Sequence, residues 1–195
     1  MSDLGFTPSE IRFATATLAA IAALAPIAYY LYPSQSQDST KHLETFNHFI
    51  NSYSTLRPQA LTTNATRDFT HTSLPAELNL PTRSIQPFRE HAQIVFDIFK
   101  DFQVVPQNDG DGGKAVHFLR DTNTVIAHCK MGGKVDKDHE LGAQLAESHI
   151  TEWWTEGVLF VKLSKDGKRV ESVREFVHSK KAEELHIRLH GSVEF

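Results

Sequence analysis

The most constraining feature of the sequence is an uncharged apolar segment close to its N-terminus. Residues 13–32 read FATATLAAIAALAPIAYYLY and contain no Asp, Glu, Lys or Arg. A helix of this length spans about 30 Å, which matches the hydrocarbon core of a bilayer. Tyr29, Tyr30 and Tyr32 stand at one end, where aromatic rings favour the lipid–water interface. The segment therefore predicts a single transmembrane anchor, preceded by a short tail over residues 1–12.

Two other interpretations of this segment stay open. A cleaved signal peptide fits the apolar core, although Arg12 is the only cation before it, against Asp3 and Glu10. A helix packed on a partner or on the folded domain fits as well. Arg12 and Lys41 balance each other across the segment, so charge does not set an orientation. With an anchor, we expect a single-pass protein of an endomembrane.

The rest of the chain has the composition of one folded domain. Residues 33–40 are polar and of low complexity, which is typical of a linker, so the domain is expected over residues 41–195. The chain is 40% hydrophobic and 23% charged, which excludes a wholly disordered protein. Its net charge of -4 offers no basic surplus for phosphates, so nucleic acid is not an expected partner.

The order of predicted elements indicates an α+β domain. An apolar stripe from Leu43 to Leu56 predicts a first helix that Pro58 ends. A strand over residues 67–74 and a second helix over residues 85–102 are then expected. Further strands follow over residues 102–105, 115–119, 124–131, 150–163 and 170–178, and a final helix over residues 180–189. Residues 132–148 are interpreted as a polar insertion. Helices gathered on one side of an antiparallel sheet are the α+β pattern.

Three stretches carry a resemblance to a known family. Residues 69–78 (FTHTSLPAEL) are similar to its "THxxLP" segment, and residues 156–163 (EGVLFVKL) to its "NEYxxxL" strand. Residues 166–168 (DGK) followed by 173–179 (VREFVHS) are similar to its "DG…EEFVDS" region. By their order and spacing, the stretches resemble the SnoaL-like branch of the nuclear-transport-factor-2-like superfamily, and small fungal proteins of secondary metabolism in particular. Thr155 and His178 depart from the usual Asn and Asp.

The resemblance implies a cone-shaped barrel, in which a curved antiparallel sheet wraps around helices. It also implies a cofactor-free enzyme of secondary-metabolite biosynthesis, of a polyketide or terpenoid-like kind. The superfamily includes cyclases, isomerases, dehydratases and epoxide hydrolases beside non-enzymatic binding modules, so the fold leaves the reaction open. Many such barrels form dimers through the sheet, which makes a homodimer an expected partner.

Strand parity selects Glu175 as a candidate catalytic group. Val173, Glu175 and Val177 share one face of their strand, and an acid between apolar neighbours indicates a carboxylate that points into the cone, with Val173 and Val177 as candidate substrate contacts. Burial would raise its pKa and suit it to acid or base catalysis. The resemblance favours Glu175, because the matching carboxylate of related enzymes lies in the pocket. An ion pair with Arg174 or Lys162 at a sheet edge is the structural alternative.

A second face adds further candidates for the same pocket. Glu156 shares a face with Trp154 and Val158, so it is a candidate second acid, and Trp154 and Val158 are candidate substrate contacts. A solvated carboxylate and a core or interface aromatic are the alternatives for Glu156 and Trp154. Trp153 precedes Trp154 directly, so one ring should point inward and the other outward.

Two histidines are candidates for proton transfer and binding. His71 lies in the first matching stretch and is predicted to act as a catalytic acid or base near the mouth of the barrel. His128 is a weaker candidate for substrate binding, since either His128 or Cys129 faces inward. Cys129 is the only cysteine, which excludes an internal disulfide and a Cys-rich zinc site.

We expect no metal and no cofactor. His186 and His190 have i, i+4 spacing but no third ligand nearby. The Asp109–Gly112 run begins like a calcium loop, but Arg120 stands where the closing Glu belongs. The sequence thus favours an acid/base enzyme that acts on a small apolar metabolite by epoxide opening or cyclisation, isomerisation or dehydration. A non-catalytic, membrane-anchored binding or dimerisation module is the alternative.

Overall fold

The computed structural model describes residues 39–190. The predicted tail, the apolar segment 13–32 and most of the predicted linker lie outside these residues, and no helix within 39–190 is long and apolar enough to cross a membrane. The prediction of a membrane anchor therefore stays a prediction.

The first described helix, α2 (Ser39–Ser52), begins two residues earlier than the domain boundary expected from composition. Ser39 and Thr40 belong to this helix rather than to the linker, and Ser and Thr are common at helix starts. The side chains of His42, Phe46, Phe49 and Ile50 are buried at the i, i+4, i+7, i+8 spacing of one helical face. Short 3₁₀ turns η1 (Tyr53–Thr55) and η2 (Ala60–Thr62) follow.

Strand β1 (Ala65–Leu74) leads through η3 (Ala76–Leu78) to helix α3 (Ile85–Phe96). The helix ends six residues before the predicted end at Phe102. The chain leaves the helix here because the backbone of residues 98–100 bonds to another segment: Lys100 N–H donates to Lys134 O and Asp136 N–H donates to Ile98 O. Ile98, Phe99 and Phe102 are still buried, but they enter the core from this turn.

The middle of the chain holds β2 (Gln103–Pro106), β3 (Val116–Leu119), η4 (Arg120–Thr122) and β4 (Thr124–Lys134). The predicted polar insertion over 132–148 is wrong in part. Its first three residues extend β4, and Glu140–Glu147 form helix α4, whose Leu145 is fully buried. Gly142 permits this packing, since a Cβ there would lie 1.9 Å from Asp136 O.

The C-terminal half of the sheet is a hairpin of β5 (Glu152–Leu163) and β6 (Val170–Val177), followed by helix α5 (Ser179–His190). Leu163 pairs with Val170, whereas Lys162 pairs with Ser172, so Glu171 is an extra residue on β6. Such a β-bulge shifts the register by one position. Beyond the bulge, Leu159 pairs with Glu175 and Gly157 with Val177.

The six strands form one sheet with the order β1-β6-β5-β4-β2, and β3 pairs with β4 beside β2. The prediction of an antiparallel sheet is wrong at one edge, because β1 runs parallel to β6. The sequence shows local hairpin signals, and these cannot reveal a partner that follows about a hundred residues later. The α+β class is confirmed, with a curved mixed sheet.

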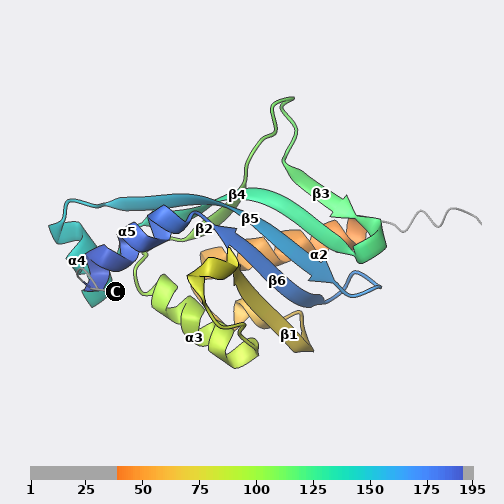
Figure 1. Cartoon of the computed structure of the whole chain (residues 1–195), viewed down its shortest axis with the longest axis horizontal. Coiled ribbons are helices and arrows are strands. Elements are labelled where there is room, and N and C mark those ends of the chain that lie inside the picture. The colour runs from red at the N-terminus through yellow and green to blue at the C-terminus, as the bar shows by residue number, and fades with distance from the viewer. Residues whose placement is uncertain (1–38, 191–195) are drawn as a thin grey trace, which may run out of the picture. The chain divides into compact units, whose positions relative to one another are not determined.

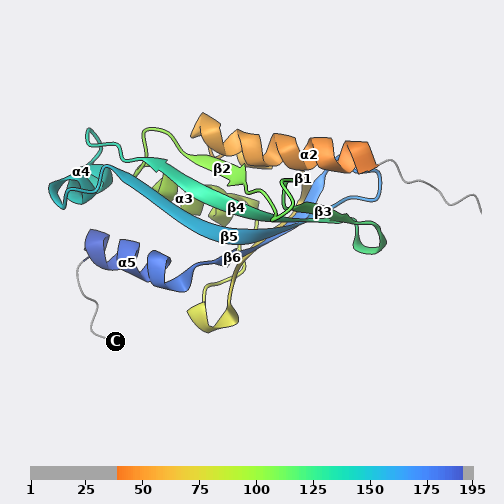
Figure 2. The ribbon, with the colours of Figure 1, turned by 90° about the horizontal axis from the view of Figure 1, so that it is seen from above.

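Helices cover both faces of this sheet. Helix α2 passes behind the strands in Figure 1 and lies along one face in Figure 2, whereas α5 lies on the other side. Ring contacts between Tyr53 and Phe96 and between Phe88 and Phe69 place α3 in the same core as α2. We call the face toward α2 and α3 the inner face and the opposite one the outer face. Buried inner-face side chains include Val125, Ala127, Leu159, Val161 and Val173.

Candidate active site

A histidine and a glutamate form a hydrogen-bonded pair on the inner face. His71 Nε2 lies 3.2 Å from Glu175 Oε2. The imidazole is 1% exposed, whereas the glutamate side chain keeps 20% of its surface exposed. The carboxylate is thus the member of the pair that solvent or a small molecule can reach.

Strand register brings the pair together. In the parallel β1–β6 pair, His71 is the partner of Val173 and Ser73 is the partner of Glu175, so all four side chains lie on one face. The backbone of His71 also exchanges two hydrogen bonds of 2.8 Å with Arg83, which ties the loop before α3 to β1. This bridge fixes the position of the histidine along the strand.

An aromatic contact fixes the orientation of the His71 ring. Phe88 of α3 stacks on it with a centroid distance of 4.6 Å and an interplanar angle of 28°. His71 Nδ1 is buried and has no hydrogen-bond partner within residues 39–190. A neutral ring that donates Nε2–H to Glu175 avoids a buried, unsatisfied N–H at Nδ1. We therefore assign His71 the part of a donor that holds Glu175.

The electrostatics keep Glu175 ionised. Burial raises the pKa of its carboxyl, but this is outweighed by the hydrogen bond from His71, by the charge of Arg83 and by the charges that His71 and His91 carry when they are protonated, so the pKa lies below its ordinary value. The expectation of a raised pKa is therefore wrong, because it considered the apolar neighbours along β6 and not the cations from other elements. An ionised carboxylate at neutral pH acts as a base rather than as an acid.

Four further groups lie near enough to interact electrostatically with Glu175. His91 of α3 is a half-buried histidine whose pKa falls to about 4, chiefly by burial and then by the charge of Arg83. Burial and the charge of Glu175 raise the pKa of Tyr53, and they raise that of Cys129 to about 12. Arg83 is 9% exposed, and its Nη1 donates to Ser73 Oγ at 3.4 Å. At neutral pH the set therefore offers a neutral imidazole, a neutral phenol, a thiol and a guanidinium.

Sequence patterns did not select Arg83, Tyr53 and His91 as site residues. Tyr53 and His91 lie within the predicted apolar helices, over residues 43–56 and 85–102, and a polar side chain on such an apolar face is a signal that could have selected both. Arg83 lies in an irregular segment between η3 and α3, where periodicity gives no indication of direction.

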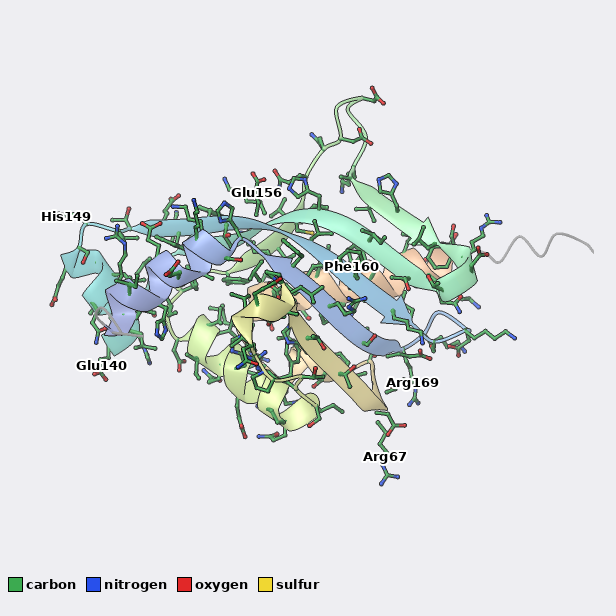
Figure 3. All side chains as sticks on the ribbon, in the orientation of Figure 1. Arg67, Glu140, His149, Glu156, Phe160 and Arg169 are labelled. Carbon is green, nitrogen blue, oxygen red and sulfur yellow. The ribbon has the colours of Figure 1, made fainter. Side chains whose placement is uncertain are left out.

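The other predicted site residues on β4 and β5 lie on the outer face. Lys130 pairs with Glu156, His128 with Val158 and Gly132 with Trp154, whereas the inner-face positions are Cys129, Gly157 and Leu159. Glu156 and Phe160, both labelled on β5 in Figure 3, share this outer face. The structure thus separates Glu156, Trp154, His128 and Val158 from Glu175, and the shared pocket expected for them does not form.

The bulge at Glu171 explains the separation. Without the extra residue, the register set by Leu163 and Val170 would pair Glu175 with Val158, on the face of Glu156. Glu156 instead lies near His128, with 3.2 Å between its Oε2 and Nε2, and its side chain is 61% exposed. Lys130 lies over the Trp154 ring, 5.1 Å from its centroid. On the outer face, Glu156 and His128 thus form a solvated surface pair, and Lys130 and Trp154 form a cation–π contact beside it.

The remaining predicted contacts stay on the inner face. Val173 is fully buried and Val177 is half-buried, both on the side of Glu175. Of the two tryptophans, Trp153 is the buried one, at 8% exposure. Within residues 39–190, no group of His, Cys, Asp and Glu side chains has a geometry that could hold a metal ion.

Comparisons with known proteins identify the fold. No protein-family model and no curated protein sequence matches the chain. Among solved structures, AusH from Aspergillus nidulans is similar at a TM-score of 0.58 and 20% identity, over 72% of this chain and 85% of that one. The BvnE pinacolase from Penicillium brevicompactum is similar at 0.64 and 12% identity, over 76% of this chain and 94% of that one.

A bacterial structure shows the same likeness. A protein described as a SnoaL-like polyketide cyclase, from Shewanella denitrificans, has a TM-score of 0.55 and 10% identity, over 74% of this chain and 96% of that one. At these identities the likeness is one of fold. The domain of residues 39–190 shares the fold of these proteins, one of which is described as SnoaL-like.

Proposed function

We propose that this domain is an acid/base enzyme that moves a proton on a small, largely apolar metabolite, with Glu175 as the general base. The observation that carries the proposal is the His71–Glu175 pair: a partly exposed carboxylate, held by a buried imidazole and kept ionised by that hydrogen bond and by the charge of Arg83. A positioned base of this kind contributes typically about 10²- to 10⁴-fold to a rate. His71 acts through Glu175 and is a positioning residue.

The surroundings of the pair support an apolar substrate. Leu159 and Val173 flank Glu175 on the inner face, and Val177 follows along the same strand. Tyr53, whose raised pKa keeps it protonated, supplies a hydroxyl that donates a hydrogen bond or returns a proton. A base and a neutral donor together support an isomerisation or a cyclisation, and they serve dehydration or epoxide opening by the same proton transfers.

The similar folds support a place in secondary metabolism. They include a pinacolase and proteins from Aspergillus and Penicillium, besides the protein described as a polyketide cyclase. We propose a reaction of the isomerase or cyclase type in a fungal secondary-metabolite pathway, with no requirement for a cofactor.

Complementation tests the catalytic proposal with a matched pair of variants. In a strain of the source organism that lacks this gene, the wild-type chain should restore a metabolite, and Glu175→Gln should not, although the protein accumulates and folds. Glu156→Gln removes a carboxylate from the outer face of the same sheet and should restore the metabolite fully. Growth in deuterated water should add deuterium to the product at the carbon that receives the proton.

Two results would overturn the proposal. One is full restoration by Glu175→Gln at wild-type protein levels. The other is a metabolite profile that does not change when the gene is deleted under conditions in which the protein is made.

The apolar segment 13–32 supports a membrane location near lipophilic intermediates, and we propose a single-pass anchor in an endomembrane. Ile21→Arg combined with Leu24→Arg places two charges at the centre of the segment, each at a cost of about 2.5–3.5 kcal/mol in an inserted helix. The double variant should move the protein from the membrane fraction to the supernatant. An unchanged distribution would contradict the anchor.

The outer face supports a homodimer as a second proposal. Phe176 is 47% exposed on β6, and Trp154 and Phe160 lie on the same face. Phe176→Asp should convert a dimer to a monomer in light scattering without loss of fold. A wild-type chain that is monomeric at the same concentrations would exclude this interface.

A further inference from the structure

A cavity of about 230 Å³ lies beside α4, at the left end of the domain in Figure 1. Its walls come from the turn after α3, the end of β4, helix α4 and the two residues that precede β5. Most of the wall belongs to residues 134–151, which lie largely within the stretch that the sequence led us to interpret as a polar insertion. This stretch therefore encloses a space of its own.

The cavity is separate from the His71–Glu175 pair, neither member of which lines it. Lys134, which does line it, pairs with Glu152 at the start of β5, whereas Glu175 pairs with Leu159. Glu152 and Leu159 are seven residues apart on one strand, which corresponds to about 23 Å. A ligand in the cavity would thus be bound independently of the proposed base.

Backbone hydrogen bonds hold the walls of the cavity together. Lys100 N–H donates to Lys134 O at 2.9 Å and joins the turn after α3 to the end of β4. Val135 N–H donates to Thr151 O, also at 2.9 Å, and joins the end of β4 to the segment before β5. Because the walls are fixed in this way, a ligand would not have to order them on binding.

The wall of the cavity is mostly apolar. Val135 is buried, and Ala146 and Ile150 are half-buried, so part of the surface of all three is covered by the fold already. An apolar wall of this kind favours a hydrocarbon group over water.

Three lysines line the same cavity: Lys100, Lys134 and Lys137. In the part of the chain that the structure describes, none of the ion pairs includes any of them. Asp136 and Asp138 also line the cavity, but their carboxylates do not approach the three ammonium groups within ion-pair distance. The Asp136 carboxylate instead accepts a hydrogen bond from Asp138 N–H at 3.1 Å. Three cations against two carboxylates leave the cavity with a positive balance.

We propose that this cavity binds a short-chain carboxylic acid, with the chain against the apolar wall and the carboxylate among the lysines. The combination of a hydrocarbon surface and unpaired ammonium groups matches a molecule that has one apolar part and one anionic part. The volume lies below the range of about 300–1,000 Å³ that is usual for pockets of drug-sized ligands, so the chain is short. The site is additional to the proposed active site and does not depend on it.

Titration calorimetry with octanoate tests the proposal on the full-length protein in lipid nanodiscs, with empty nanodiscs as the blank. Octanoate should saturate one site. Octanol, which has the same chain without the charge, should bind about tenfold more weakly or less, because it cannot form charged hydrogen bonds. Hexanoate should also bind about tenfold more weakly, since two buried methylene groups are lost. Decanoate should gain little over octanoate, because its additional methylene groups extend beyond the cavity.

Matched variants assign the binding to this cavity. Lys134→Met combined with Lys137→Met should weaken octanoate binding by about tenfold or more and leave octanol binding unchanged. Lys130→Met removes an ammonium group from the outer face of the same strand and should bind octanoate like the wild type. Ala146→Leu partly fills the cavity and should weaken the binding of both molecules. Denaturation midpoints check that each variant is folded.

Glu175→Gln should bind octanoate like the wild type although it is expected to be inactive in complementation, so the two proposals can fail separately. The inference is overturned if the folded double lysine variant binds octanoate as tightly as the wild type does. It is also overturned if octanol binds as tightly as octanoate, if affinity continues to rise with chain length as it does in lipid partitioning, or if octanoate does not saturate a site. A loss of octanoate binding in Glu175→Gln would place the acid at the proposed active site instead and would equally exclude the cavity beside α4.

Discussion

His71 Nε2 lies 3.2 Å from Glu175 Oε2, and the two residues are 104 positions apart in the sequence. They meet because β1 and β6, early and late in the described domain, are adjacent parallel strands. The pair joins a buried ring to a carboxylate that solvent can reach. Its chemistry therefore depends on long-range strand pairing rather than on a local motif.

Replacement of His71 should change the pH at which Glu175 titrates. In His71→Gln the burial that raises the carboxyl pKa is no longer opposed by the imidazole, so the pKa should rise. The acid limb of the pH–activity profile should move to higher pH, and carbon NMR of the glutamate carboxyls should show the same shift. His128→Gln, which breaks a similar pair on the outer face, should leave the profile in place. A common profile for all three proteins would contradict the positioning role.

Acid should destabilise the domain through His91. Its folded-state pKa is about 4, below the ordinary 6.5, so the unfolded chain binds a proton that the folded chain does not between these values. Stability should fall as the pH is lowered through this window, by up to about 3 kcal/mol. The stabilisation from ionised Glu175 is lost in the same direction, as the pH falls through its lowered pKa. Denaturant unfolding at pH 7, 5 and 4 should show a smaller acid loss for His91→Gln than for the wild type.

Gly133 should not tolerate a side chain. A Cβ at this position would lie 1.7 Å from Asp101 O, which is a backbone atom of the turn after α3. Gly133→Ala should therefore cost about 3 kcal/mol, as overpacking of a close backbone contact does. Gly110→Ala is the matched control, because a Cβ there meets nothing within 4 Å. Equal denaturation midpoints for the two variants would show that β4 does not pack against this turn as described.

Cys129 should be chemically inert in the folded protein. Its side chain is fully buried, and burial raises its pKa to about 12, so almost no thiolate exists at neutral pH. Iodoacetamide should label it only at the rate at which the domain opens, and labelling should accelerate with denaturant across the unfolding transition. Rapid labelling in native buffer would place the thiol at an open surface.

The sequence allowed prediction of local structure where one periodicity continues over a whole element. The buried stripe of α2, the strand over residues 65–74 and the hairpin of β5 and β6 were expected close to their observed bounds. Helix α4 was missed because it is short and lies within a stretch that is polar on average, and only Gly142 and Leu145 are buried on its inner side. The parallel pairing of β1 was missed because no local signal encodes a distant partner.

The candidate site was predictable to the extent that resemblance and parity apply. His71 and Glu175 were selected in this way, and the structure brings them together. Arg83 could not be selected, because a loop has no periodicity and its side chain is placed by the bridge to His71. Glu156 was grouped with Glu175 because parity describes each strand separately. The register between the strands, which decides whether two such faces coincide, depends on the bulge at Glu171.

The bulge at Glu171 decides which alternate side chains of β6 lie on the inner face of the sheet. In the observed register these are Val173, Glu175 and Val177, and without the bulge they would be Arg174 and Phe176. The same eight-residue strand thus contains one surface suited to proton transfer and another suited to a protein contact. A single insertion or deletion near Glu171 would exchange them without altering any other residue. Relatives of this domain that differ in length at this turn would therefore be expected to differ in chemistry more than their sequences indicate.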